Sequence, residues 1–286
     1  TSEITLPRLL KSAGYATAHS GKWHLNGLFN NPAQPQPADH GYDWWLATQN
    51  NAGPSHENPS NFVRNGQPLG RLEGYAAPLV VDEAVAWLKS KRDPAKPFFL
   101  AVWTHEPHYP IKSDPQFKAL YPNVTDDVQR EHHANVTQMD HAFGRLMRAL
   151  DEQRLADTTL VFFTSDNGGM EGNGKEIITD NAPLDKGKTS AKEGGVRVPF
   201  LAAGPGIGGG RESDVVVNGL DFYPTILSMT GIKRPEAKTL DGSDLFPLLT
   251  TDAGDGSLVR GSDGKPRKEM VWHFPHNGAS GFQSTL

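Results

Sequence analysis

Four short clusters of polar residues contain side-chain types that bind ligands or transfer protons, and each lies next to a predicted strand. The first is Gly21-Lys22-Trp23-His24, in which a cation and an imidazole are two residues apart. In an extended segment this spacing places both side chains on the same side of the chain. Lys22 would then clamp an anion while His24 donates or accepts a proton. A surface lysine beside a packed histidine is the alternative interpretation.

The second cluster is His105-Glu106-Pro107-His108, which follows an apolar run over residues 98–103. Pro107 and Pro110 restrict the backbone on both sides of His108, as a preorganised site requires. A rigid turn that carries a solvated histidine fits the same residues. The motif alone therefore leaves both interpretations open.

The third cluster, Asp166-Asn167-Gly168-Gly169, places a carboxylate beside a side-chain amide oxygen. Such hard oxygen ligands suit Ca²⁺ or Mg²⁺. The two glycines would allow the backbone to turn tightly around an ion. Because Asp-Asn-Gly is also a common turn sequence, the cluster by itself indicates either a divalent-metal site or a plain turn.

The fourth cluster covers residues 186–195 and contains Gly187-Lys188-Thr189. These three residues resemble the end of a phosphate-binding loop. That pattern requires a glycine where this chain has Ala182, and a helix where a strand is predicted to follow. We therefore exclude nucleotide binding at this cluster.

The elements that must position these clusters alternate along the chain. Apolar runs and helical apolar spacing predict strands over 15–20, 98–103, 159–164 and 196–203, and helices over 4–13, 78–92, 127–153 and 221–230. Residues 27–75, rich in Pro, Asn and Gly, are expected to form a long irregular insertion. The alternation predicts an α/β fold with a largely parallel central sheet flanked by helices, in which ligands bind beyond the carboxyl ends of the strands.

Composition excludes several classes of protein. The 286 residues contain 28 Lys+Arg and 33 Asp+Glu, for a formal net charge of -5, so the basic surplus of a nucleic-acid binder is missing. The absence of cysteine excludes disulfides and a cysteine nucleophile within these residues. No apolar run is long enough to predict a membrane span.

Taken together, the clusters resemble the type I sulfatase family of the alkaline phosphatase-like superfamily. Residues 14–24, Gly-Tyr-Ala-Thr-Ala-His-Ser-Gly-Lys-Trp-His, match the family signature Gly-Tyr-x-Thr-x-x-x-Gly-Lys-Trp-His at every fixed position. The order continues with 165–169, Lys188 and Glu193-Gly-Gly-Val-Arg-Val-Pro199. Later landmarks are similar at 221–225, 240–242 and 272–276. The resemblance extends over nearly the whole chain and implies the sulfatase version of the predicted α/β fold.

The resemblance also implies roles for individual residues. Lys22, Lys188 and His108 would contact sulfate oxygens, and His108 would protonate the leaving oxygen. His24 would assist the nucleophile of the family, which is the hydrate of a formylglycine aldehyde. Asp166 and Asn167 would bind a divalent metal, commonly Ca²⁺. Cations, imidazoles and a metal suit a sulfate ester, because negative charge spreads over its oxygens and leaving group in the transition state.

One part of the family pattern is missing from these residues. The family uses a Cys or Ser in Cys/Ser-x-Pro-x-Arg, which maturation converts to formylglycine. The only Ser-x-Pro here is Ser113-Asp-Pro115, and Phe117 stands where the arginine belongs. Paired aspartates that complete the metal site are absent as well. Both normally precede the first signature, and helical spacing begins already at Ile4.

We therefore expect residues 1–286 to be an internal segment of a sulfatase catalytic domain. The smaller C-terminal subdomain would be largely missing, and the segment alone would be inactive. The expected substrate is a sulfated small molecule or carbohydrate, and the protein is expected to be periplasmic or secreted. Two alternatives remain: a phosphodiesterase or phosphonate hydrolase of the same superfamily, and a non-catalytic protein that binds sulfated glycans.

Overall fold

Strand β1 (Ala16–Lys22) is the strand that carries the first cluster, and it lies inside a five-stranded sheet of order β4-β3-β2-β1-β5. Its neighbours β2 (Trp44–Thr48) and β5 (Phe98–Trp103) both run parallel to it. Lys22 pairs with Thr48, and Gly21 pairs with Trp103. Since parallel strands end at the same edge, the residues that follow β1, β2 and β5 gather there.

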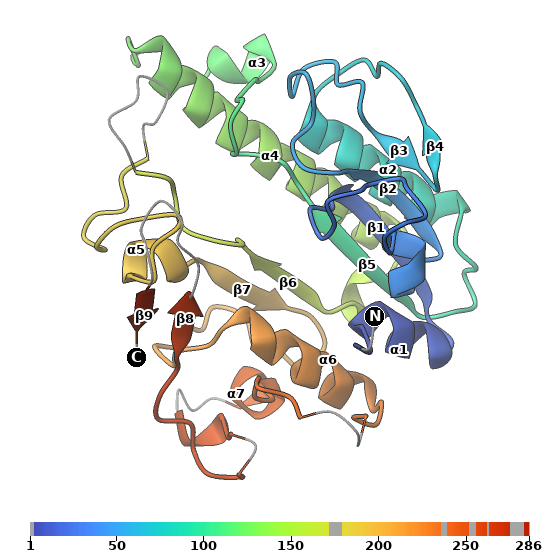
Figure 1. Cartoon of the computed structure of the whole chain (residues 1–286), viewed down its shortest axis with the longest axis vertical. Helices are drawn as coiled ribbons and strands as arrows, with labels where there is room; N and C mark the ends of the chain where they lie inside the picture. Colours follow the sequence, from blue (N-terminus) through green and yellow to red (C-terminus); the bar gives the residue numbers. More distant parts are fainter. Residues whose placement is uncertain are drawn as a thin grey trace. The chain divides into compact units, whose positions relative to one another are not determined.

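The computed structural model describes residues 3–171, 179–235, 239–251, 256–261, 263–274 and 283–285. The chain forms two compact units, Thr1–Leu155 and Ala156–Leu286, each of which is described by itself. Figure 1 shows the elements of both units in the colours of the sequence. No helix in this described part is both long and apolar enough to cross a membrane.

Two helices lie on one face of the sheet in the first unit (Figure 1). Helix α2 (Ala76–Ser90) packs on β1 and β5, and the hydroxyl of Ser20 donates a hydrogen bond of 2.7 Å to the carbonyl of Val80. Helix α4 (Asp127–Glu152) packs on α2, and the Asp126 carboxylate accepts a bond from the Gln129 amide at its start. The apolar periodicity predicted both helices to within two residues at each end.

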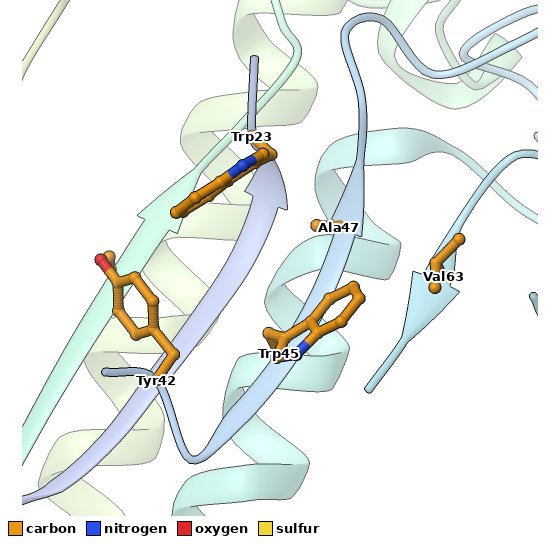
Figure 2. Close-up of a cluster of buried hydrophobic side chains, with 6 residues drawn as sticks. Trp23, Tyr42, Trp45, Ala47 and Val63 are labelled. Carbon is orange, nitrogen blue, oxygen red and sulfur yellow. The ribbon is translucent and has the colours of Figure 1, made fainter. Parts of the chain in front are cut away.

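The opposite face of the sheet is covered by aromatic side chains. Trp23, Tyr42 and Trp45 are at most 5% exposed and pack with Ala47 and Val63, as Figure 2 shows. β1 is therefore buried on both faces, because its side chains alternate between the helices and this aromatic layer.

The segment predicted as an irregular insertion contributes three strands, which corrects the expectation for residues 27–75. All five residues of β2 pair in parallel with β1. β3 (Val63–Arg64) and β4 (Gln67–Pro68) extend the sheet as antiparallel strands. The five-residue run of β2 was hidden because Pro- and Asn-rich loops surround it. The sheet is mixed rather than largely parallel, since only β1 and its two neighbours share one direction.

Glu83 links the added strands to α2. Its buried carboxylate accepts hydrogen bonds from the Trp44 indole at 2.7 Å and from the Arg64 guanidinium at 2.9 Å. A buried charge is tolerated when it is paired and hydrogen-bonded in this way. The contact explains how a short strand such as β3 keeps its place at the sheet.

The described residues of the second unit form two separate two-stranded sheets. β6 (Val161–Thr164) pairs antiparallel with β7 (Phe200–Ala203), and β8 (Trp272–Phe274) with β9 (Gln283–Thr285). The strand expected over 196–203 begins only at Phe200, because Val196 ends the short helix α5 (Glu193–Val196). Among the residues that the structure describes, the remaining elements are α1 (Leu6–Ser12), α3 (Pro115–Lys118), α6 (Phe222–Thr230), α7 (Phe246–Thr250) and short 3-10 turns at Pro37–His40, Ala156–Thr158, Gly219–Asp221 and Gly256–Leu258.

A buried ion pair joins the Asp221–Thr225 landmark to Arg267. The fully buried carboxylate of Asp221 accepts hydrogen bonds from the Arg267 guanidinium at 2.7 and 3.0 Å, and from the backbone amides of Asn218 and Ser243. Thr225 accepts a bond from the Leu245 amide at 2.8 Å. The Asp221–Thr225 landmark therefore has a structural role. Pro275 and His276 of the last landmark lie outside the described residues.

Gly21 is the position in β1 where a side chain cannot be accommodated. Its φ is +120°, and an added Cβ would lie 1.8 Å from the carbonyl oxygen of Trp103. We expect Gly21→Ala to lower the free energy of unfolding by about 3 kcal/mol or more, because backbone atoms of β5 must move. Urea unfolding of the two proteins measures the difference.

Gly14→Ala is the matched control for this substitution. Gly14 also has a positive φ, +92°, but an added Cβ would meet no atom within 4 Å. It should cost only the conformational strain of about 1 to 2 kcal/mol. Equal losses in the two variants would show that the contact with β5 is unimportant.

Candidate functional site

The carboxyl edge of β1, β2 and β5 presents the residues of the first two clusters. Lys22 is half-buried at the end of β1, and the next two backbone amides donate to the carbonyls of Thr48 and Gln49 at 2.9 and 2.7 Å. His24 is exposed and has a φ of +48°, so the chain is no longer extended there. The extended spacing that would place Lys22 and His24 on one side therefore ends at Lys22.

His108 lies in a tight turn directly after β5. Its backbone amide donates to the carbonyl of His105 at 2.9 Å, and its ring Nδ1 lies 2.6 Å from the carbonyl oxygen of Tyr109. A carbonyl oxygen only accepts, so Nδ1 carries the proton of this bond. A proton passed between the ring and a ligand would therefore travel through Nε2.

Two buried imidazoles lie behind this edge. His56 is 0% exposed and His105 is 1% exposed, and their ring centroids are 5.9 Å apart. Burial, followed by the positive charges of His108 and Lys22, lowers the pKa of His56 to about 4. Burial also holds the pKa of His105 well below its usual value, with His56 and Lys22 adding to the effect. Both rings are therefore neutral at pH 7. Lys22 and His108 lie near enough to lower the pKa of both.

His56 was missed in the sequence because its strand was missed. Once residues 44–48 are recognised as a strand, His56 becomes a polar residue in the loop beyond a carboxyl end, the same signal that singled out His108. The side-chain amide of Asn51 joins this loop to the His108 turn, because its Nδ2 donates a hydrogen bond of 2.8 Å to the carbonyl of Tyr109. The backbone carbonyl of His56 also accepts a bond from the first residue of α2.

Glu106 is the buried carboxyl of the same turn. One of its oxygens accepts a hydrogen bond of 2.7 Å from the backbone amide of Ala77, in the first turn of α2. Burial raises the pKa of Glu106 to about 7, although this bond and others lower it in part. The turn that carries His108 is therefore anchored to the start of α2 by a group that gains a proton near neutral pH.

In the second unit the Asp166 loop packs against the segment that carries Lys188. The amide of Gly168 donates to the carbonyl of Gly195 at 2.9 Å, and the amide of Lys188 donates to the carbonyl of Gly169 at 2.8 Å. Asn181 bonds both the amide and the carbonyl of Gly169. The structure thus places the Asp166-Asn167 and Lys188 clusters side by side, although about twenty residues separate them in sequence.

The glycines of these clusters allow backbones to touch rather than allowing a turn around an ion. An added Cβ on Gly168 would lie 1.8 Å from the carbonyl oxygen of Gly194, and one on Gly187 would lie 2.2 Å from that of Gly169. Neither glycine has the left-handed φ that a tight glycine turn would use. The close approach of the two loops therefore explains why Gly168 and Gly187 are glycines.

Asp166 and Asn167 are compatible with a hard cation but do not complete a site for one. Asp166 is exposed and Asn167 is half-buried. Two oxygen donors are fewer than the six to eight that Ca²⁺ takes. Across the described ranges, no group of three or more His, Asp or Glu side chains could hold a metal ion.

The six predicted site residues are thus found in two groups. Lys22, His24 and His108 follow strands of the first unit, and Asp166, Asn167 and Lys188 follow β6 and precede β7 in the second. Lys22 and His108 share two buried imidazole neighbours, and Asp166, Asn167 and Lys188 belong to loops joined by hydrogen bonds. The backbone amide of His24 joins it to the residue after β2.

Comparison with known proteins gives a consistent result. The Sulfatase family model matches residues 1–232. The N-acetylgalactosamine-6-sulfatase of Canis lupus familiaris is 30% identical over 264 residues, which cover 86% of this chain and 48% of the relative. The ulvan-active sulfatase of Formosa agariphila is 31% identical over 271 residues, covering 87% and 50%. The chain spans about half the length of the curated relatives it matches.

Solved structures agree with the fold. The crystal structure of Ps i-CgsB in complex with k-i-k-neocarrahexaose has a TM-score of 0.75 at 28% identity, covering 85% of this chain and 56% of that one. A protein solved with its substrate D-glucosamine-2-N,6-O-disulfate has the same TM-score at 21% identity, over 97% and 69%. The second likeness concerns the fold alone. Together they confirm the α/β architecture.

Glu106 predicts a pH dependence of stability. Folding raises its pKa from 4.5 to about 7, so the folded state holds the proton more tightly than the unfolded state does. This contribution is fully present below pH 4.5 and is lost as pH rises through 7. Between pH 5 and pH 8 the free energy of unfolding should fall by about 2 to 3 kcal/mol relative to Glu106→Gln.

Urea unfolding of the two proteins at several pH values measures this difference. The glutamine in Glu106→Gln keeps an acceptor for the Ala77 amide but cannot ionise. Glu73→Gln, at a carboxylate that is 80% exposed, serves as the control and should leave the pH dependence as it is. Parallel pH profiles for the original protein and Glu106→Gln would contradict the assignment.

Proposed function

The chain belongs to the sulfatase family, and from that premise we propose that the full-length protein hydrolyses sulfate esters of a carbohydrate. The observation that carries the proposal is the presence of Lys22 and His108 together at the edge of the first sheet. These two positive or proton-donating groups are backed by two neutral imidazoles, His56 and His105. Such an edge favours an anionic ligand.

The chemistry of a sulfate ester matches these groups. In the proposed reaction Lys22 and Lys188 neutralise the sulfate oxygens, whose charge changes as the bond to the leaving oxygen breaks. His108 gives its Nε2 proton to that oxygen, and the Tyr109 carbonyl stabilises the charged ring through Nδ1. His24 assists the nucleophile. These roles are supported by the match of Lys22, His24, His108 and Lys188 to the family pattern.

A divalent metal and the nucleophile complete the proposal. Asp166 and Asn167 would hold Ca²⁺ together with ligands from elsewhere in the full-length protein, and a bound Ca²⁺ would offset negative charge on the sulfate. The exposure of Asp166 makes its carboxylate accessible to an ion. The nucleophile, a formylglycine, would come from the part of the full-length protein that these residues do not include.

Sulfated carbohydrate is proposed as the substrate because of the relatives' names. They include an N-acetylgalactosamine-6-sulfatase and an ulvan-active sulfatase. A periplasmic or secreted location, where polysaccharides are degraded, accords with this substrate.

Replacement of Lys22 tests the proposed function. In the full-length matured protein, Lys22→Ala should lower kcat/KM for 4-nitrophenyl sulfate and for a sulfated galactosamine by about 10²- to 10³-fold, as expected for the loss of one charge stabiliser. Lys112→Ala removes an exposed lysine four residues after His108 and should leave the rate unchanged. Turnover of phosphodiesters or phosphonates but not of sulfate esters would overturn the proposal, as would binding of sulfated sugar without turnover.

Calcium binding tests the roles of Asp166 and Asn167. A ligand that binds only the folded protein stabilises it, by about 3 kcal/mol at a hundredfold excess over Kd. Ca²⁺ added after chelator treatment should therefore raise the Tm of the full-length protein, and Asp166→Ala should abolish the rise. Asp214→Ala, at an exposed aspartate of the same unit, should retain it. An equal rise in both variants would exclude Asp166 as a ligand.

A further inference from the structure

The hydrogen bonds of Thr48 determine which nitrogen of His105 carries a proton. The Thr48 hydroxyl lies 2.6 Å from the carbonyl oxygen of Asn50, which only accepts, so its single proton is used there. His105 Nε2 lies 2.8 Å from the same hydroxyl and must therefore donate to it. His105 is the Nε2–H tautomer, and its Nδ1 is a buried acceptor without a partner among the described residues.

This bond joins the ends of two strands through one ring. Thr48 is the last residue of β2, and His105 follows β5 by two residues. Between these strands lies β1, whose last residue is Lys22, in register with Thr48. The His105 ring thus crosses the edge of the sheet at the level of Lys22, and it packs against Phe62 and His56 with centroid distances of 5.4 and 5.9 Å.

The turn that carries His108 has three anchors of this kind. The His105 ring is fixed by Thr48, the Tyr109 carbonyl by Asn51, and the Glu106 carboxyl by Ala77. His108 sits between His105 and Tyr109 in the turn, and its own amide bonds the carbonyl of His105. The residue whose ring Thr48 holds is thus also the residue whose backbone carbonyl holds the His108 amide.

We propose that His105, held by Thr48, is a positioning residue that orients His108 relative to Lys22. The inference rests on the proposed sulfate ester hydrolysis, since it concerns the same site. His105 is 1% exposed, so it does not meet the substrate itself. The neutral ring of His56 packs behind it. This ring is completely buried and contacts that of His105 edge to face.

Precise placement of His108 matters because proton transfer depends steeply on distance. A misplacement of about 1 Å can cost a hundredfold in rate even when binding is retained. Loss of the Thr48 bond should therefore reduce kcat and leave KM nearly unchanged, because Lys22 still binds the anion. A neutral ring suits this role, since a positive charge on His105 would repel the nearby Lys22 ammonium.

The experiment compares two buried threonines of the first sheet in the full-length protein. Thr48→Val removes the acceptor for His105, and Thr48→Ser restores it. Thr17→Val is the matched control: Thr17 is also 0% exposed, donates to a backbone carbonyl at 2.7 Å, and lies at the opposite end of β1. Thr48→Val should lower kcat by about tenfold or more with KM within about threefold. Thr48→Ser and Thr17→Val should keep kcat within about twofold.

A kcat in Thr48→Val equal to that in Thr17→Val would overturn the proposal, and so would failure of Thr48→Ser to restore the rate. Both valine variants lose one buried hydroxyl. Comparable decreases in Tm would therefore show that lost stability does not account for a difference in kcat between them. A KM effect without a kcat effect would also contradict a positioning role.

NMR of protein labelled at the histidine rings separates this proposal from the proposed function. His105, assigned by the loss of its signal in His105→Gln, should show the Nε2–H tautomer at pH 7. Thr48→Val should shift the signals of both His105 and His108, whereas Thr17→Val should shift neither. An Nδ1–H tautomer, or unmoved His108 signals, would refute the positioning role even in an active enzyme. Absence of sulfate ester hydrolysis in the unaltered protein would instead refute the proposed function.

Discussion

The parallel pairing of β1 with β2 and β5 is the constraint on which the candidate site residues of the first unit depend. The register places Lys22 beside Thr48 and Gly21 beside Trp103, so three strands end at one level. Gly21 is required because the carbonyl of Trp103 occupies the space of a side chain. The polar residues beyond the strand ends then come within reach of one another without any long-range folding of the loops themselves.

Burial determines the electrostatic character of this edge. His56 and His105 are enclosed by the loop after β2 and by the turn after β5, and desolvation keeps both rings neutral. Lys22 and His108 remain at the boundary. Because a charged group is costly inside a protein and inexpensive at its surface, the neutral imidazoles are buried and the Lys22 cation lies nearer the solvent. The resulting arrangement suits an anionic ligand.

The second unit uses backbone contact where the first uses side chains. Gly168, Gly187 and Gly194 each lie against a carbonyl oxygen of a neighbouring loop, at distances that leave no room for a Cβ. These contacts bring the Asp166-Asn167 pair next to Lys188. From sequence, Gly168 and Gly169 indicated a tight turn around an ion or a plain turn, whereas the structure shows close packing between two loops.

The sequence by itself determined the family, the longer helices, the apolar strands and the candidate site residues. Apolar patterning predicted the strand over 98–103 and helices over 78–92 and 127–153, which are observed as β5, α2 and α4. Spacing and family resemblance singled out Lys22 and His108 as candidates. Only the tertiary structure showed that residues 44–48 pair with β1, that His56 faces His105, and that Thr48 fixes the tautomer of His105. Periodicity and propensity act between neighbours in sequence. Desolvation, register and charge proximity depend on residues that the fold alone brings together, and no local pattern encodes them.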